Sequence, residues 1–408
     1  MAGFERLISF RDLAIVTLIL NSSHHHLKIA LMEIQIKKVV SRKDLLKFIK
    51  FPFVLYKNDP CWVPPLISAE IEELTPKNPA FEFCESILLL AYKNGQVAGR
   101  IAGIINHRYI DLWHEQIARF CWFDFIDDYE VSGALLKAVE KWASEKGMEK
   151  LMGPMGFTTF ERQGVLVEGF DKVPTIASSF NHPYYAAHLE YHGYLKDHDY
   201  VEYLIRVPDR LPEKSDQLAD LVSERYHLHP LRTRSKKVLM KYSHSLFDVI
   251  NAAYSPLHGF VPLTDKQVGF FLKKFNALIS PDFISVVRDE NDVVVGFQIA
   301  IPSLSRAFQK AKGKLFPFGF IHILKAIYKP ERVDLMLVGI RPEYQNKGVS
   351  AFFMNEITRT CIRKKIPFGE SNGMLEENFK VLHFMKYYDA APQKRRRLFF
   401  KFLAKNSK

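Results

Sequence analysis

An order of secondary-structure elements that occurs twice is the feature that most constrains the fold of this 408-residue chain. In each half, two strand-like segments joined by a turn precede a buried strand, an amphipathic helix, a further strand, a second helix and a last strand. The turns are indicated by Asn94-Gly95 in the first half and by residues 289–292 in the second. Because the spacings differ between the halves, the repeat is one of architecture and not of close sequence.

This order predicts an α/β chain of the mixed α+β kind, in which each of two tandem domains has a mostly antiparallel twisted sheet flanked by helices. We expect strands at 33–36, 86–92, 96–106, 119–126, 150–152 and 200–207 in the first half, and at 283–288, 293–301, 333–340, 367–370 and 397–403 in the second. We expect helices at 129–146, around Asn181 with an end near Gly193, at 348–364, and from near Glu376.

A mass of 47.3 kDa exceeds what one hydrophobic core usually organises, which also favours two domains. We place them at 32–210 and 211–408. The apolar run at 13–20 is too short to span a bilayer, and Met32 begins a strand-like segment. We interpret residues 1–31 as an artefact of start-site choice, with a weak membrane anchor or metal binding by the histidines at 24–26 as alternatives.

Composition restricts the partners and the compartment. The 57 basic residues against 45 acidic ones give a net charge of +12, which favours anionic partners. Cys61, Cys84, Cys121 and Cys361 are scattered without metal-ligand spacing, so we interpret them as core or surface thiols of a cytoplasmic protein without a metal.

The most informative stretch is the strand–loop–helix junction at residues 337–351. A helix start presents unpaired N–H groups and the positive end of the helix dipole, and so favours phosphate. Gly348 permits a close approach of a ligand to the backbone, and Lys347 adds positive charge. An ordinary strand-to-helix loop would also explain a single glycine at this place.

The surrounding pattern resembles the signature of the GNAT acyltransferase superfamily, in which a hydrophobic strand precedes Gln/Arg-x-x-Gly-x-Gly/Ala at a helix start. Gln345 and Gly348 occupy the first two signature positions, and Ser350 replaces the third. The resemblance implies an acyl-CoA or acyl carrier protein thioester as co-substrate, with no metal. It implies cofactor contacts from Val338, Ile340, Gln345, Lys347, Gly348, Val349, Ser350 and Asn378, of which Val338 and Ile340 would contact the pantetheine arm through their backbone.

Acyl transfer to an amine also needs a group that accepts a proton from the nucleophile. Glu370 is our candidate base, although a solvated glutamate at a strand end would look the same in sequence. The tyrosine acid of many relatives falls near Met385, which cannot donate a proton. Tyr387 or Tyr388 would have to substitute, and core packing is the alternative interpretation of both.

The equivalent junction in the first half, residues 127–133, carries Asp127, Asp128 and Glu130 in place of basic and glycine residues. Carboxylates would repel a pyrophosphate, so we expect this domain to keep the fold but not the cofactor. The insertion at 155–174 is a candidate lid for the acceptor pocket, and a surface excursion is the interpretation that we slightly prefer.

Residues 305–332 form a long connection that is rich in lysine and in aromatic and aliphatic residues. Such a segment beside an acyl-transfer site predicts peripheral contact with the inner face of a membrane. Packing between the two domains is the rival interpretation. The basic run at 394–397 would extend the same basic surface or lie solvated on a strand end.

Over most of residues 32–403, including 55–65 and Gly153-Pro154, the chain resembles bacterial tandem GNAT-like proteins of the ceramide synthase type. The resemblance implies transfer of a long-chain acyl group to a lipid amine such as a sphingoid base. Alternatives are a small-molecule N-acetyltransferase, a Fem-type transferase that uses aminoacyl-tRNA, and a non-catalytic binding module. We expect a thioester donor and an amine acceptor as partners, and not nucleic acid.

Overall fold

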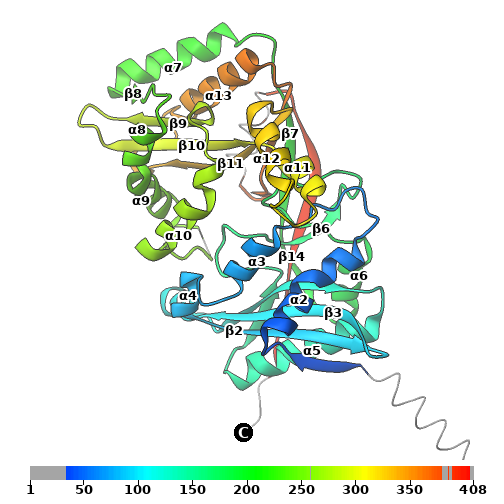
Figure 1. Cartoon of the computed structure of the whole chain (residues 1–408). Coiled ribbons are helices and arrows are strands. Elements are labelled where there is room, and N and C mark those ends of the chain that lie inside the picture. The colour runs from blue at the N-terminus through cyan, green and yellow to red at the C-terminus, as the bar shows by residue number, and fades with distance from the viewer. Residues whose placement is uncertain (1–33, 258, 379–384, 386–387, 405–408) are drawn as a thin grey trace, which may run out of the picture.

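The computed structural model describes residues 34–257, 259–378, 385 and 388–404 (Figure 1). The predictions for residues 1–31 lie outside this part of the chain. One mixed sheet runs through the molecule in the order β1-β2-β3-β4-β5-β14-β7-β12-β11-β10-β9-β8, with helices packed on it in both halves. The predicted fold class is confirmed.

The hairpin of the first half forms at the predicted turn, where Asn94 and Gly95 have φ angles of 53° and 74°. The elements of this half are β1 (Gln35–Lys38), α2 (Arg42–Leu55), α3 (Ile67–Glu73), β2 (Cys84–Lys93), β3 (Gln96–Asn106), α4 (His107–Trp113), β4 (Ile117–Phe125), α5 (Tyr129–Glu145), β5 (Lys150–Gly153), β6 (Val165–Glu168), α6 (Tyr184–Tyr191) and β7 (Leu195–Arg206).

The second half begins with four helices and a two-residue strand, which precede the repeated order. Its elements are α7 (Glu213–Tyr226), β8 (His229–Pro230), α8 (Lys236–Lys241), α9 (Ser243–Tyr254), α10 (Asp265–Phe275), β9 (Ile284–Arg288), β10 (Val294–Pro302), α11 (Ser305–Ala311), α12 (Gly319–Tyr328), β11 (Arg332–Ile340), α13 (Ser350–Lys364), β12 (Phe368–Ser371), β13 (Met374–Leu375) and β14 (Ala390–Phe402).

The last strands of the two halves cross over. β7 pairs with β12 of the second half, whereas β14 returns to pair with β5 and β6 of the first half and with β7. In Figure 1, β14 and β7 lie side by side where the two halves meet. The two halves therefore share one sheet, and the division into 32–210 and 211–408 stays a prediction.

Two expected helices differ from the structure. Asn181 precedes α6 in extended chain, where its side chain accepts from the N–H of Leu166 (2.7 Å) and donates to the C=O of Leu166 (3.1 Å). Pro183 disfavours helix before it, so α6 starts only at Tyr184. Glu376 lies in a turn after β13, and residues 379–384 lie outside the described part of the chain.

The apolar stripe predicted for the helix of the second half is buried along its length. Its five members are 5% exposed or less and pack on β9, β10 or the neighbouring helix α7: Val349, Phe352, Phe353, Ile357 and Cys361. This packing fixes α13 against β9, β10 and α7. The four cysteines are free and buried, as core thiols are.

Candidate functional site

The candidate site lies where β11 and β12 separate. The two strands pair in parallel only over residues 332–335 and 368–371. β11 then continues to Ile340 and pairs there with β10 alone among the described strands. Asn372, which follows the last paired residue of β12, bridges the two strands where they begin to separate, because its side chain donates to the C=O of Met336 (3.0 Å). One backbone edge of β11 is thus open towards the start of α13.

The loop between β11 and α13 brings the predicted cofactor residues together. Gly348 has φ +80°, and a Cβ atom there would lie 2.9 Å from Cγ2 of Val222 on α7. Val349 precedes the first helical residue, Ser350, without a side chain that caps the helix. The N–H groups at this helix start are therefore not taken by a side-chain cap.

Lys347 and Gln345 complete the loop. The Nζ atom of Lys347 lies 4.9 Å from the ring centroid of Tyr226 and 5.1 Å from that of Tyr344, which holds its charge beside the helix start. Gln345 is exposed, and its Nε2 donates to the C=O of Ile340 (3.1 Å). Gln345 therefore closes the end of the strand.

At the two residues whose backbone is expected to contact pantetheine, the C=O groups already accept hydrogen bonds. The C=O of Val338 accepts from the hydroxyl of Tyr254 on α9 (2.7 Å), and that of Ile340 accepts from Gln345. A ligand that used these oxygens would have to displace the side chains. The contacts at Val338 and Ile340 stay predictions.

The start of α5 in the first half differs from the start of α13. Asp128 caps it by accepting from the N–H groups of Glu130 (2.9 Å) and Val131 (3.3 Å), and it is ion-paired with Lys93. Its carboxylate occupies the position where a phosphate would bind at an uncapped helix. This geometry supports our hypothesis that the first half lacks the cofactor.

Glu370 is fully buried on β12 rather than solvated at a strand end. One carboxylate oxygen is ion-paired with Lys394 of β14 and the other with Arg332 of β11. Glu370 would have to release one of these cations to accept a proton. Its role as the base stays a prediction.

The other predicted site residues are only partly described. Tyr387 lies outside the described residues, as does most of the segment before it. Asn378 is half-buried behind the turn that follows β13. Burial raises the pKa of Tyr388 to about 12, so it would remain protonated at neutral pH.

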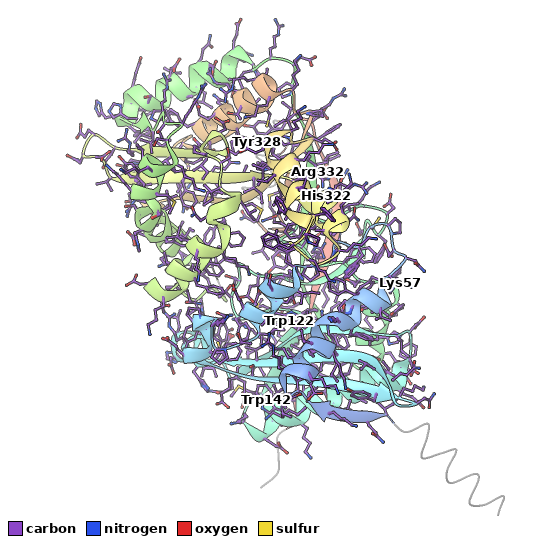
Figure 2. The ribbon with its side chains drawn as sticks, in the orientation of Figure 1. Lys57, Trp122, Trp142, His322, Tyr328 and Arg332 are labelled. Carbon is purple, nitrogen blue, oxygen red and sulfur yellow. The ribbon has the colours of Figure 1, made fainter. Side chains whose placement is uncertain are left out.

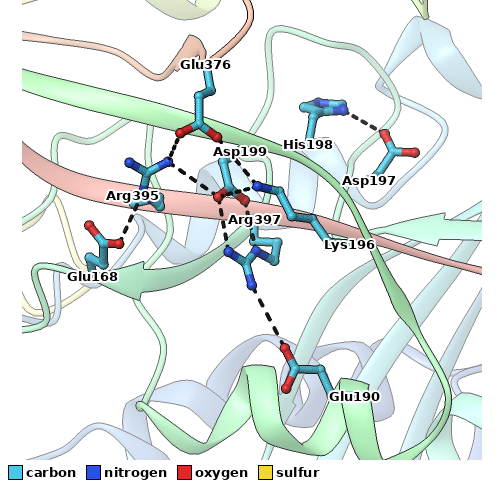
Figure 3. Close-up of polar contacts among 9 residues, drawn as sticks. All are labelled: Glu168, Glu190, Lys196, Asp197, His198, Asp199, Glu376, Arg395 and Arg397. Carbon is cyan, nitrogen blue, oxygen red and sulfur yellow. Dashed lines mark hydrogen bonds and ion pairs between the residues drawn. The ribbon is translucent and has the colours of Figure 1, made fainter.

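The basic run at 394–397 does not form a free basic surface, which corrects both of our interpretations. Lys394 and Arg396 are 2% exposed, and both pair with Glu202, at 3.1 and 2.6 Å. On the opposite face of β14, Arg395 and Arg397 pair with Asp199 (3.4 and 2.9 Å; Figure 3). The sequence did contain a signal for this arrangement. Successive side chains of a strand point to opposite faces, so residues 394 and 396 must share one face and residues 395 and 397 the other.

The insertion at 155–174 is buried between the halves at its start, so the preferred surface excursion is wrong for this part. The ring of Phe160 lies 5.9 Å from those of Tyr254 and Phe260. The amide of Gln163 accepts from the hydroxyl of Tyr200 on β7 (2.6 Å). The insertion therefore contacts elements of both halves.

One buried cluster in the first half contains a serine, a histidine and an aspartate, as nucleophile sites do, but it is closed to substrates. The hydroxyl of Ser132 lies 2.8 Å from Nδ1 of His188, whose Nε2 lies 2.9 Å from Asp127. Ser132 and His188 are 0% exposed, and the ring of Tyr129 stacks on His188 at 3.8 Å. No substrate can reach the hydroxyl, so the cluster holds α5 to α6.

Comparison with known proteins agrees with this geometry. No family model matches the chain. The chain has the fold of the GNAT acyltransferases in tandem: it matches a tandem GNAT protein from the clavulanic acid biosynthesis pathway with a TM-score of 0.53 at 9% identity, over 91% of this chain and 99% of that one. The predicted resemblance is confirmed.

Two curated proteins are similar over most of their length. Protein YghO of Escherichia coli (strain K12) is 29% identical over 379 residues, which are 90% of this chain and 95% of that protein. The bacterial ceramide synthase of Caulobacter vibrioides (strain NA1000 / CB15N) is 27% identical over 327 residues, which are 77% and 82% of the two chains.

Two features of the described residues bear on membrane and metal. No helix in this part of the chain is long and apolar enough to cross a bilayer. Within the same residues, no group of three or more His, Cys, Asp or Glu side chains is arranged to hold a metal ion.

Proposed function

We propose that this protein is an N-acyltransferase that takes an acyl group from acyl-CoA, or from an acyl carrier protein thioester, and transfers it to an amine. The observation that carries the proposal is the start of α13, which has no side-chain cap and lies beside the open edge of β11. The same junction in the first half is capped by Asp128. Of these two equivalent junctions, only the one before α13 is therefore free of a side-chain cap that would compete with a pyrophosphate.

The loop residues suit this role chemically. Lys347 adds a positive charge beside the helix start, and Gly348 leaves the backbone open to close approach. The bound thioester would supply the activated acyl group. The chain would orient the donor along β11, where Val338 is 43% exposed, and admit the amine from the side of β12.

Donor binding tests the proposal directly. We expect palmitoyl-CoA to bind the full chain in a calorimetric titration, and Gly348→Glu to weaken binding by about tenfold or more, because its carboxylate would face the phosphate. A non-glycine residue at a positive φ also costs about 1–2 kcal/mol, whatever the ligand does.

Gly147→Glu is the matched control for that strain. Gly147 has the same φ of +80° and follows α5 in the first half, and a Cβ atom there would have no other atom within 4 Å. We expect this variant to bind palmitoyl-CoA as the wild type does. If the wild-type protein binds neither acetyl-CoA nor palmitoyl-CoA, the proposal of a CoA thioester as the donor is wrong.

We further propose that the acyl group is long and that the acceptor is a lipid amine such as a sphingoid base. The similarity to a bacterial ceramide synthase supports this substrate class. We expect the purified protein to acylate a long-chain amino alcohol with palmitoyl-CoA, measured by the mass of the product. Turnover of acetyl-CoA with soluble amines alone would contradict the lipid substrate and leave N-acyl transfer intact.

Access to such a substrate would come through α12 and the loop before it. Among the residues described, this segment holds a group of apolar side chains that are 36–78% exposed: Phe316, Phe318, Phe320, Ile321, Leu324 and Tyr328. Lys325 lies in the last turn of α12, and Lys329 follows its last residue. Figure 2 labels His322 and Tyr328 in this region. We propose that this apolar and basic surface contacts an anionic bilayer.

The two interpretations of residues 305–332 divide between the two helices. α11 packs on the first half: Nε2 of Gln309 donates to the C=O of Pro60 (2.8 Å), and the hydroxyl of Ser305 donates to the C=O of Pro174 (2.6 Å). α12 buries Gly319 and Ile323, packs Ala326 and Ile327 partly against α11, and leaves Phe320, Ile321, Leu324 and Tyr328 exposed. The membrane proposal therefore concerns α12 and not α11.

Vesicle sedimentation tests the membrane contact. We expect binding to vesicles of phosphatidylglycerol and phosphatidylcholine, and a reduction of about tenfold in the double variant Phe316→Ser/Phe318→Ser, since both rings are largely exposed. Leu221→Ser on α7, with Leu221 63% exposed, is the control and should bind as the wild type does. Equal loss in the control, or no binding by the wild type, would contradict the proposal.

A further inference from the structure

A row of basic side chains follows the exposed face of α2 in the first half. Its members are spaced by four, three, four and three residues, so they lie on one side of the helix and of its C-terminal end: Lys43, Lys47, Lys50, Val54 and Lys57. All five are exposed, whereas the opposite side of α2 is buried against β2, β3 and β4. The hydrophobic core therefore does not explain this row.

Little negative charge compensates the row on α2. Residues 42–57 contain five lysines and arginines and one acidic residue, Asp44, whose carboxylate lies 3.9 Å from Nζ of Lys47. In the part of the chain that the structure describes, no ion pair within 4.0 Å includes Lys43, Lys50 or Lys57. Three exposed lysines without an acidic neighbour favour an anionic partner.

The C-terminal end of α2 adjoins the segment that leads into α12. The N–H of Ile67, at the start of α3, donates to the C=O of Gly313 (3.0 Å), and a Cβ atom on Gly313 would lie 2.5 Å from the ring of Phe53 on α2. Figure 1 shows the end of α2 and the helices α11 and α12 on the same side of the molecule, and Figure 2 labels Lys57 and His322 there. The row on α2 and the exposed surface of α12 are therefore neighbours across the boundary of the halves.

The two neighbouring surfaces combine basic and exposed apolar side chains in the same way. Residues 305–330 contain six lysines and arginines and no acidic residue, and Phe316 and Phe318 are 71% and 68% exposed. On α2, Val54 is 73% exposed among the lysines. We propose that α2 binds the headgroups of anionic phospholipids, so that the bilayer contact proposed for α12 extends across both halves. This inference rests on that contact and not on the chemistry of acyl transfer.

The composition of the row favours a bilayer over a nucleic acid. Its cations are all lysines, whose apolar stems can lie along the interface while the ammonium groups reach the headgroups. Its one apolar member, Val54, gains by entering the apolar side of the interface, and it has no ring on which a base could stack. Contact through helices of both halves would also fix how the molecule lies on the membrane, because two separate elements determine its orientation.

Vesicle sedimentation of the full chain tests the contribution of the charges. We expect Lys50→Gln/Lys57→Gln to bind vesicles of phosphatidylglycerol and phosphatidylcholine about tenfold less tightly than the wild type, because two cations near an anionic surface are lost. The matched control is Lys137→Gln/Lys141→Gln, which removes the same charge from α5, on the other face of the sheet of the first half. We expect it to bind as the wild type does, and equal binding by the two double variants would overturn the inference.

A fluorescent label tests directly whether α2 touches the lipid. The four native cysteines are buried, so bimane on Val54→Cys reports on this position. We expect brominated lipid to quench the label there and on Phe318→Cys, but not on Leu221→Cys. Quenching at 318 without quenching at 54 would overturn the inference and leave the contact of α12 intact, and quenching at neither would overturn both. Tighter binding to duplex RNA than to vesicles, lost in Lys50→Gln/Lys57→Gln, would make nucleic acid the partner and also overturn the inference.

Discussion

Asp334 is fully buried on β11, next to the ion pair of Arg332 and Glu370. Burial raises the pKa of its carboxyl from 3.8 to about 7, against the lowering effect of Arg332 and with a further rise from Glu370. Between these two pH values the native state holds a proton that the unfolded state has released. This group therefore makes the wild-type protein less stable as the pH rises from about 4 to 7.

Asp334→Asn should remove this dependence. We expect the free energy of unfolding of the variant minus that of the wild type to increase by on the order of 1–3 kcal/mol from pH 5 to pH 8, because only the wild type loses stability over this range. Urea denaturation at the two pH values measures the difference, and Asp209→Asn on the surface is the control. A relative stability that is the same at both pH values would contradict the proposed protonation.

The residues of the candidate site show what a single sequence can predict. Gln345, Lys347 and Gly348 were found because a loop before an amphipathic helix leaves a local pattern that needs no knowledge of tertiary contacts. Glu370 was predicted as the base, with a solvated glutamate as the alternative, and its burial could not be predicted because its partners Lys394 and Arg332 come from two other strands.

At the scale of elements, the hairpins, the buried strands and both long helices were predictable, because Asn-Gly turns and apolar periodicity are local signals. The exchange of β7 and β14 was not. Each half ends in a strand with the same pattern, and pattern alone does not say which sheet edge such a strand joins. The start of α6 was misplaced because Asn181 binds the backbone of β6, which is a tertiary contact.

The role of buried ion pairs in holding the exchanged strand β14 can be tested by mutation. Lys394 is 2% exposed and lies between Glu202 and Glu370, so Lys394→Met would leave two buried carboxylates without this cation. We expect a loss of about 3–5 kcal/mol in the free energy of unfolding. Arg395→Met, one residue further on the more exposed face, should cost about 1 kcal/mol or less. Equal losses in urea denaturation would mean that the buried pairs do not hold β14.

At the scale of the whole molecule, the shared sheet predicts that the halves unfold together. β14 pairs with β5 and β7, and β7 pairs with β12, so neither half can keep its sheet when the other unfolds. The four tryptophans lie in the first half, at 62, 113, 122 and 142, so their fluorescence reports on that half and, through the hydrogen bond from the indole of Trp113 to the C=O of Phe260 (2.9 Å), on its contact with the second. Far-UV circular dichroism reports on the helices and strands of both.

We therefore expect the two signals to change at the same urea concentration in a single transition. In Lys394→Met both midpoints should fall by the same amount, because the residue lies where the two halves exchange strands. A fluorescence transition that precedes or follows the dichroism change would show that the halves unfold independently. Strand exchange would then join two separately stable domains.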